Sequence, residues 1–176
     1  MRIISGKFKG RIIPVSPKLK ARPTTDKAKE ALFNRLNFEI EYESLSVLDL
    51  FSGTGNISLE FASRGVEDIT AVDIRHEHVK FINSTFKQLG INGIVLQTDV
   101  FKFLSRPKKS YHLVFADPPY DMENFDELVE LTLSGELLKD KGLFILEHGP
   151  GKDFSKHKNF ADVRSYGKVH FTRFEK

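Results

Sequence analysis

The chain of 176 residues contains no cysteine and no long apolar run. The lack of cysteine excludes disulfide bonds and thiol nucleophiles, and any zinc site would need histidine and carboxylate ligands alone. No 18 consecutive residues are apolar, and the first thirty hold no apolar stretch of seven, so we expect neither a membrane span nor a signal peptide. The length suits one ordinary domain, which we expect to be cytoplasmic and monomeric.

Charge is distributed unevenly, although the formal net charge is only +3. Residues 1–38 hold ten basic and two acidic side chains, a balance of +8. Residues 39–151 hold ten basic and nineteen acidic ones (−9), and residues 152–176 hold seven and three (+4). Basic ends on an acidic body can neutralise phosphates, which dominates nonspecific affinity for nucleic acids. Solvated basic surface segments are the alternative interpretation.

The first fourteen residues predict a β-hairpin with a basic tip. Two β-branched runs flank a turn that is bounded by glycines. Lys7, Lys9 and Arg11 gather around this tip, with Phe8 between them. The pattern suits phosphate contacts combined with base stacking, so the three basic residues are candidate RNA contacts. An exposed turn with solvated charges would have the same pattern.

The rest of the chain alternates helical and strand-like patterns. The segment Thr24–Asp26 can cap a first helix, whose apolar residues recur at helical spacing. Repeated βα units predict an α/β, Rossmann-like fold, a mostly parallel sheet with helices on both faces. The predicted elements are helices over 26–37, 56–64, 76–89, 100–104 and 124–134, strands over 46–51, 69–73, 94–98, 112–116 and 143–147, and an antiparallel edge hairpin within 162–174.

A glycine turn follows the first predicted strand, within VLDLFSGTGN at 47–56. Ligands of doubly wound sheets bind beyond the carboxyl ends of the strands, and Gly53 and Gly55 permit a close approach of ligand to backbone. The third glycine of a dinucleotide-binding turn is missing, because Ser58 stands in its place. Asp49 would repel a pyrophosphate but can accept a hydrogen bond from an ammonium group. The turn therefore favours S-adenosylmethionine over NAD.

Two further carboxylates end the next two predicted strands. Asp73 can accept hydrogen bonds from both hydroxyls of a ribose, which either cofactor carries. Asp99 can accept one from an adenine amino group, with Ile74 and Val100 or Phe101 packed on the ring. Each acid alone is as readily a helix cap or surface residue, but acids at three successive strand ends favour a nucleoside site. The predicted cofactor-binding residues are Asp49, Phe51, Gly53, Gly55, Asp73, Ile74, Asp99 and Val100.

The strand predicted over 112–116 stops at Asp117, Pro118, Pro119 and Tyr120. Neither proline can continue a central strand, so the motif forms a stiff turn, and a plain chain stop is its structural interpretation. An exocyclic amine of a nucleobase is a poor nucleophile, because its lone pair is delocalised into the ring. The Asp117 carboxylate and the Pro118 carbonyl can accept its hydrogens and hold it for in-line attack on a methyl sulfonium, while Tyr120 stacks on the base. These four residues are the predicted catalytic motif, which requires no metal.

The chain resembles the RsmD-type methyltransferases, class I enzymes that methylate N2 of a guanine in bacterial small-subunit (16S) ribosomal RNA. The resemblance lies in RIISG and KGR within 2–11, RPTTD and KEALFN within 22–34, DLFSGTG at 49–55 and DPPY at 117–120. It implies seven strands with the last one antiparallel, S-adenosylmethionine as the cofactor, and RNA in a ribosomal particle as the substrate. It also implies one domain over 1–176, with a basic RNA-holding extension over 1–22 and a catalytic core over 23–176. Arg22 would lie near the cofactor or the target base, as a further RNA contact.

Three positions depart from the usual family pattern. Asp73 stands where glutamate is commoner, and Ser52 and Asn56 stand where alanine is usual. The shorter carboxylate should still reach a ribose, so we expect none of these departures to disable the protein.

Two other functions fit parts of the sequence. DNA adenine-N6 methylation shares the motif at 117–120, but such enzymes usually add a target-recognition region, and only 59 residues follow Asp117. A noncatalytic RNA-binding protein on the same fold would leave this motif unexplained. The choice of guanine N2 rests on the resemblance, because the motif itself selects an amine and not a base.

Overall fold

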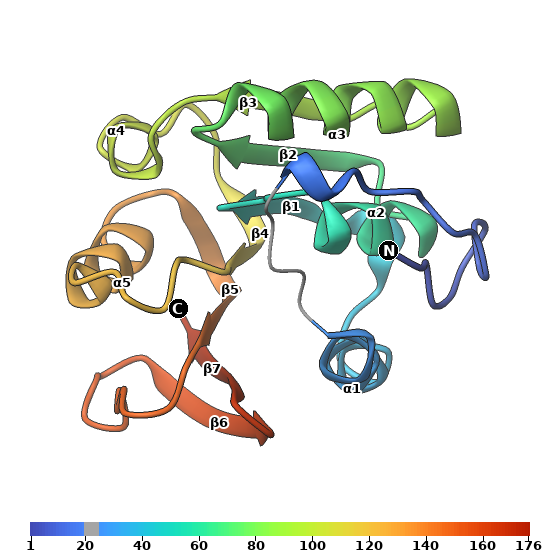
Figure 1. The fold of residues 1–176 in the computed structure, drawn as a ribbon. Coiled ribbons are helices and arrows are strands. Elements are labelled where there is room, and N and C mark those ends of the chain that lie inside the picture. Colours follow the sequence, from blue (N-terminus) through green and yellow to red (C-terminus); the bar gives the residue numbers. More distant parts are fainter. Residues whose placement is uncertain (20–24) are drawn as a thin grey trace.

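A seven-stranded sheet forms the centre of the computed structural model, which describes residues 1–19 and 25–176 (Figure 1). The strands lie in the order β3-β2-β1-β4-β5-β7-β6, and β7 runs opposite to the other six. From β1 the chain adds β2 and β3 on one side, and it then returns to add β4 on the other side of β1. Doubly wound sheets bind ligands at such a switch point, here between β1 and β4. The strands are β1 Ser46–Leu50, β2 Asp68–Asp73, β3 Ile94–Gln97, β4 Tyr111–Ala116, β5 Leu138–His148, β6 Phe160–Tyr166 and β7 Val169–Glu175. The predicted Rossmann-like fold and the implied antiparallel last strand are confirmed.

Helices cover both faces of the sheet. Alternate residues of each strand point to opposite faces, so each face has its own apolar core. Val47 of β1 belongs to a core shared with α1, α2 and α3, whereas Leu48 belongs to one shared with α4 and α5. β1 is buried along its whole length, as a central parallel strand with helices on both sides should be. Within the described ranges, no helix is both long and apolar enough to cross a membrane. The helices are α1 Asp26–Leu36, α2 Asn56–Ser63, α3 His76–Leu89, α4 Val100–Leu104 and α5 Phe125–Leu133, with short 3-10 helices η1 Pro17–Leu19 and η2 Tyr42–Ser44.

Thr25 caps α1 by accepting a hydrogen bond from the Ala28 amide at 3.2 Å, as the sequence predicts. The other predicted helices agree with the structure within a residue or so at each end. One strand differs more, since β5 begins at Leu138 and not near residue 143. Leu138 pairs with Tyr111 of β4 across a register shift, and the intervening Lys141 has a left-handed φ of 60°. Exposed charges and a left-handed residue carry no strand signal, so only pairing with β4 reveals this extension.

The N-terminal segment forms a short antiparallel hairpin, in which Arg2 is bridged to Ile12. On either side of this bridge the Ile3 amide donates to the Arg11 carbonyl at 3.0 Å and the Ile13 amide donates to the Met1 carbonyl at 2.8 Å. The predicted hairpin is therefore confirmed, although its paired part is too short to form two named strands. The backbone between the arms bonds to α2 instead of across the loop: the amides of residues 4 and 5 donate to the Glu60 carboxylate at 2.9 and 3.0 Å, and those of residues 7 and 8 donate to Ser63 at 2.7 and 3.0 Å. Gly6 makes this contact possible, since a Cβ there would lie 1.8 Å from the Ser63 carbonyl oxygen.

Candidate active site

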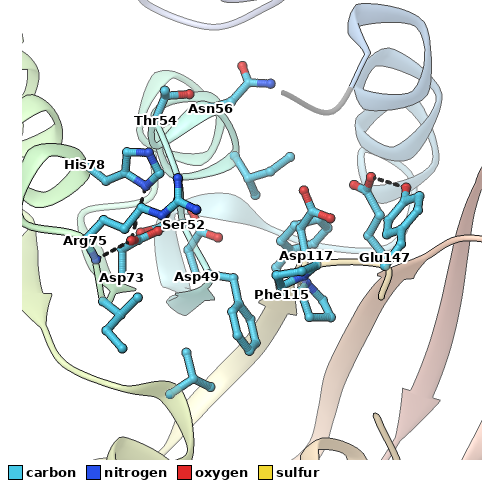
Figure 2. A pocket seen from close by; sticks show the side chains of 18 of the residues that line it. Asp49, Ser52, Thr54, Asn56, Asp73, Arg75, His78, Phe115, Asp117 and Glu147 are labelled. Atoms are coloured by element: carbon cyan, nitrogen blue, oxygen red, sulfur yellow. Dashed lines mark hydrogen bonds and ion pairs between the residues drawn. The ribbon is translucent and has the colours of Figure 1, made fainter. Parts of the chain in front are cut away.

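One cavity of about 630 Å³ opens at the carboxyl ends of the parallel strands (Figure 2). It joins the two predicted sites, because the glycine turn after β1 lines one part of it and the motif after β4 lines another. Its volume lies in the range of small-molecule sites in proteins. The predicted residues that line it are Asp49, Phe51, Gly53, Asp73, Ile74, Asp99, Val100, Asp117, Pro118, Pro119 and Tyr120.

The turn after β1 depends on left-handed backbone conformations. Phe51, Gly53 and Gly55 have φ values of 56°, 54° and 74°. The Gly53 amide donates to Asp73 Oδ2 at 2.8 Å, and a Cβ on Gly53 would find only the Phe51 carbonyl oxygen, at 3.9 Å, within contact distance. Gly55 differs from the prediction, since it is not among the residues that line the cavity. A Cβ there would lie 3.0 Å from Ile82 of α3, so Gly55 lets α2 and α3 pack closely.

Asp49 is a buried carboxylate at the floor of the glycine turn, with 1% of its surface exposed. Its Oδ2 accepts two hydrogen bonds from Ser58, from the amide at 3.1 Å and from the hydroxyl at 2.5 Å. Burial raises the pKa of Asp49 to about 7; the Ser58 bonds oppose this shift and the nearby Asp73 charge adds to it. A cationic group in the cavity would therefore find an acceptor whose charged form it stabilises.

Asp73 ends β2 and organises the loop that follows. Its Oδ2 accepts from the Gly53 amide at 2.8 Å. Its Oδ1 accepts from the Arg75 amide, also at 2.8 Å (Figure 2). Nδ1 of His78 lies 3.2 Å from Oδ1, but the angles do not make this contact a hydrogen bond. Nε2 of His78 carries a hydrogen, because it bonds to the Leu19 carbonyl at 2.8 Å. A carboxylate offers about four acceptor positions, so these contacts leave capacity for ribose hydroxyls.

Asp99 follows β3 and serves as the N-cap of α4, where its Oδ1 accepts from the Lys102 amide at 3.0 Å. The structure thus combines the two interpretations of this acid, since it caps a helix and also lines the cavity. Val100 is buried beside it, whereas Ile74 is 61% exposed at the cavity edge. An exposed isoleucine beside a buried valine suits the two faces of a flat ring that is partly covered.

The catalytic motif predicted from the sequence continues directly from β4. The Asp117 amide donates to the Leu50 carbonyl at 3.4 Å, so the aspartate follows the switch point between β1 and β4. The Tyr120 hydroxyl donates to Glu147 Oε1 at 2.9 Å, and the Tyr120 ring packs so closely on Gly149 that a Cβ there would lie 2.8 Å from it. The end of β5 therefore fixes the orientation of the tyrosine.

Arg75, His78 and Glu147 are among the cavity residues that the predicted site did not include. Glu147 ends the run of buried apolar residues in β5, and a carboxylate after a buried strand was the available signal. His148 is fully buried beside it and outside the cavity lining, with Nδ1 bonded to the Gly149 carbonyl and Nε2 to the Thr172 hydroxyl, both at 2.8 Å. His148 is therefore a structural histidine, and burial lowers its pKa.

The basic tip of the N-terminal loop is exposed at Lys7, Lys9 and Arg11. Lys7 Nζ and Arg11 Cζ lie 5.1 and 5.7 Å from the centroid of the Phe8 ring. Phe8 itself is half-buried and packs on the core, so it is a support for the cations more than a free stacking surface. Arg22, the fourth predicted RNA contact, lies outside the described residues.

A buried charge network, which the sequence reasoning did not identify, holds this loop to the core. Lys29 of α1 is fully buried, and its Nζ donates to the Arg2 carbonyl at 2.6 Å and to Asn56 Oδ1 at 2.8 Å. The same Nζ lies 3.5 Å from Oε2 of Glu60, the carboxylate that also receives loop amides. Burial lowers the pKa of Lys29, an effect that the Glu60 charge opposes. Asn56, one of the family departures, is thus a partner of this network.

The comparisons with known proteins agree with this geometry. The family model described as conserved hypothetical protein 95 matches residues 1–175. Ribosomal RNA small subunit methyltransferase D of Escherichia coli K12 is 31% identical over 148 residues, which covers 84% of this chain and 74% of that protein. Putative rRNA methyltransferase YlbH of Bacillus subtilis is 32% identical over 153 residues, with 84% and 82% covered. The solved putative methyltransferase yhhF of Escherichia coli has a TM-score of 0.87 at 27% identity, covering all of this chain and 97% of its own.

The fold and the cavity define a class I methyltransferase whose cofactor is S-adenosylmethionine. The chain belongs to the RsmD-type family of these enzymes. The resemblance seen in the sequence is thereby confirmed. The cavity fits the cofactor, because it combines acceptors for an ammonium and a nucleoside with a turn that a ligand can approach closely. It is lined by the buried Asp49, by the turn at Gly53 and by the carboxylates of Asp73 and Asp99. Over residues 1–19 and 25–176, no three acidic or histidine side chains are grouped to hold a metal ion.

Proposed function

We propose that this protein transfers a methyl group to the exocyclic N2 of a guanine in 16S ribosomal RNA. The observation that carries the proposal is that the carboxylates at the carboxyl ends of β1, β2 and β3 and the motif at 117–120 line the same cavity. A methyl donor and an amine must meet within bonding reach in the same cavity for transfer to occur. The relatives named as ribosomal RNA small subunit methyltransferase D support ribosomal RNA as the substrate.

The residues that would hold the cofactor follow from their chemistry. Asp49 would accept from the ammonium of its amino-acid part, and Asp73 would accept from the ribose hydroxyls. Asp99 would accept from the adenine amino group, with Ile74 and Val100 on the faces of the ring. When bound, S-adenosylmethionine supplies an electrophilic methyl group on a sulfonium. Phe51 and Gly53 would line the part of the cavity between the amino-acid end and the adenine end of the cofactor.

The motif after β4 would act on the target amine. Asp117 would accept one hydrogen of the amine and the Pro118 carbonyl the other, so that the nitrogen lone pair is directed at the methyl group. The stiff Pro118–Pro119 turn holds both acceptors before reaction, where positive charge develops on the nitrogen. Tyr120, fixed by Glu147 and Gly149, would stack on a base that has left its helix.

The N-terminal loop would hold the RNA. Lys7, Lys9 and Arg11 are exposed on an element that is bonded to α2 along its backbone, so the cations are presented on a rigid support. Preorganised phosphate contacts position a substrate without reading its sequence. We propose Arg22 as a further contact, and the small-subunit particle as the setting in which the RNA is recognised.

The test is methyl transfer from labelled S-adenosylmethionine to ribosomal RNA from a strain that lacks the enzyme, followed by nucleoside analysis. The expected product is N2-methylguanosine in 16S RNA. N6-methyladenosine would support the adenine-N6 alternative, and a methyl group on a ring carbon would refute chemistry at an amine. A comparison of the transfer rates with free 16S RNA and with small-subunit particles shows which of the two is the substrate. Failure to bind S-adenosylmethionine in titration calorimetry would leave only a noncatalytic RNA-binding protein.

A further inference from the structure

Glu147 is a buried carboxylate beside the motif at 117–120, and its role beyond the hydrogen bond from Tyr120 is open. It lines the cavity with 3% of its surface exposed. β4 and β5 are parallel neighbours in which Ala116 pairs with Leu146, so Asp117 and Glu147 follow at adjacent positions one residue farther on. Adjacent strands lie about 4.8 Å apart. Both labelled side chains lie at the same end of the cavity in Figure 2.

Tyr120 relates this carboxylate to a stacked base. Its hydroxyl lies in the plane of its ring and donates to Glu147 Oε1 at 2.9 Å, so the carboxylate lies at the rim of the ring. Gly149 supports the ring from the same strand end. A base stacked on the ring would therefore present one of its edges toward Glu147. A carboxylate has about four acceptor positions, so Glu147 can accept from more than one donor at a time.

The two neighbouring carboxylates match the hydrogens of guanine. The Watson–Crick edge of guanine carries three hydrogens side by side, one on N1 and two on the N2 amine. Adenine carries two on its amine, next to an N1 lone pair. Asp117 and the Pro118 carbonyl account for the amine in either base, and the N1 position is what differs. A carboxylate facing N1 would bond to guanine and repel adenine.

We propose that Glu147 is a specificity-determining residue that accepts the N1 hydrogen of the target guanine. The inference rests on the proposed function, since it names how that site selects its base. It also gives a role to a carboxylate near the end of β5, where burial is costly for a charge. A base whose N1 is an acceptor would lose this charge-assisted hydrogen bond. Such a base should therefore bind about 10- to 100-fold more weakly than guanine.

The experiment measures nucleoside affinity, with the protein saturated by S-adenosylhomocysteine. The probe is 2-aminopurine riboside, which keeps the N2 amine but has a lone pair at N1; its fluorescence reports binding, and guanosine competes. We expect wild-type protein to prefer guanosine by about tenfold or more, and Glu147→Gln to lower this preference by about tenfold or more, because an amide can donate to N1. 1-Methylguanosine, which lacks the N1 hydrogen, should bind wild-type protein as weakly as the probe does.

Tyr120→Phe is the matched control, because it removes the hydroxyl bonded to Glu147 and keeps both the ring and the carboxylate. Its guanosine preference should stay within about threefold of wild type. An equal change in Tyr120→Phe and Glu147→Gln, or no change in Glu147→Gln, overturns the proposal and makes Glu147 a support for the tyrosine. So does a wild-type protein that binds the two nucleosides equally, a result that requires no variant to fold. RNA carrying N2-methylguanosine together with an unchanged preference refutes this inference alone; another methylated nucleoside refutes the proposed function.

Discussion

Asp49→Asn should make the protein more stable at neutral pH, although it removes a carboxylate of the proposed cofactor site. Burial raises the pKa of Asp49 from about 3.9 in an unfolded chain to about 7 in the folded protein. Between these pH values the folded state binds a proton that the unfolded state does not, so the free energy of unfolding falls as pH rises. The difference of about three pKa units corresponds to a loss of about 4 kcal/mol in the free energy of unfolding. This loss begins above about pH 4 and is complete above about pH 7.

The substitution removes this titration and keeps the shape of the side chain. The free energy of unfolding of Asp49→Asn minus that of wild type should therefore increase by up to about 4 kcal/mol between pH 4 and 7 and then level off. Urea denaturation of the protein without cofactor, repeated at half-unit intervals from pH 4 to 8, measures this difference. A difference that is independent of pH, or that decreases as pH rises, would refute the reasoning.

Ser58→Ala provides the control, because the Ser58 hydroxyl donates to Asp49 Oδ2 and favours the charged form. Without it the pKa of Asp49 should rise further, and the pH-dependent loss of stability should extend to higher pH. In wild-type protein, the affinity for S-adenosylmethionine should increase by up to about tenfold per pH unit from about pH 5 to 7, since binding an ammonium requires the charged carboxylate. Titration calorimetry of wild type and Asp49→Asn should show this pH dependence only in the former.

Asp117→Ala should abolish methyl transfer and leave the affinity for S-adenosylmethionine within about threefold; an equal loss of both, by calorimetry and single-turnover assay, would move Asp117 into the cofactor site. Gly6→Ala should lower the free energy of unfolding by more than about 3 kcal/mol, because strain of about 1–2 kcal/mol for a left-handed residue adds to a backbone clash. Gly10→Ala shares the positive φ but has nothing within 4 Å of the added Cβ, so urea denaturation should show a loss of only about 1–2 kcal/mol. Changing Lys7 and Arg11 to alanine should weaken RNA binding and reduce its salt slope by about 1 for each phosphate that the loop no longer neutralises; an unchanged slope would make the loop a structural element only.

The regular elements were predictable, because local patterns decide them. Apolar runs of strand length, Thr25 as a cap and Gly53 as a turn residue each act through neighbours close in the chain. The first residues of β5 were not predictable, since Lys141 adopts a left-handed conformation within a strand held by pairing with β4. The N-terminal hairpin was predictable, but the hydrogen bonds from its turn to α2 were not, because they join segments more than fifty residues apart.

Site residues divide in the same way. Asp49, Asp73, Asp99 and Asp117 were identified because each lies at or near the carboxyl end of a strand, and these ends meet at one edge of a parallel sheet. Glu147 was missed, although it too lies near the carboxyl end of a strand, because no motif surrounds it and its significance appears only beside Tyr120.

The sequence by itself determined the fold class and the positions of the glycine turn and of the motif at 117–120 at the ends of strands, since these depend on residue type and spacing. Tertiary structure decided three things: which predicted residues share one cavity, how far the pKa of Asp49 rises, and which carboxylate meets the rim of Tyr120. Burial and contact between distant segments set all three. Lys29 shows the same limit, because its position on the apolar face of α1 is visible in the sequence but its partners, Glu60 and Asn56, are brought to it only by folding.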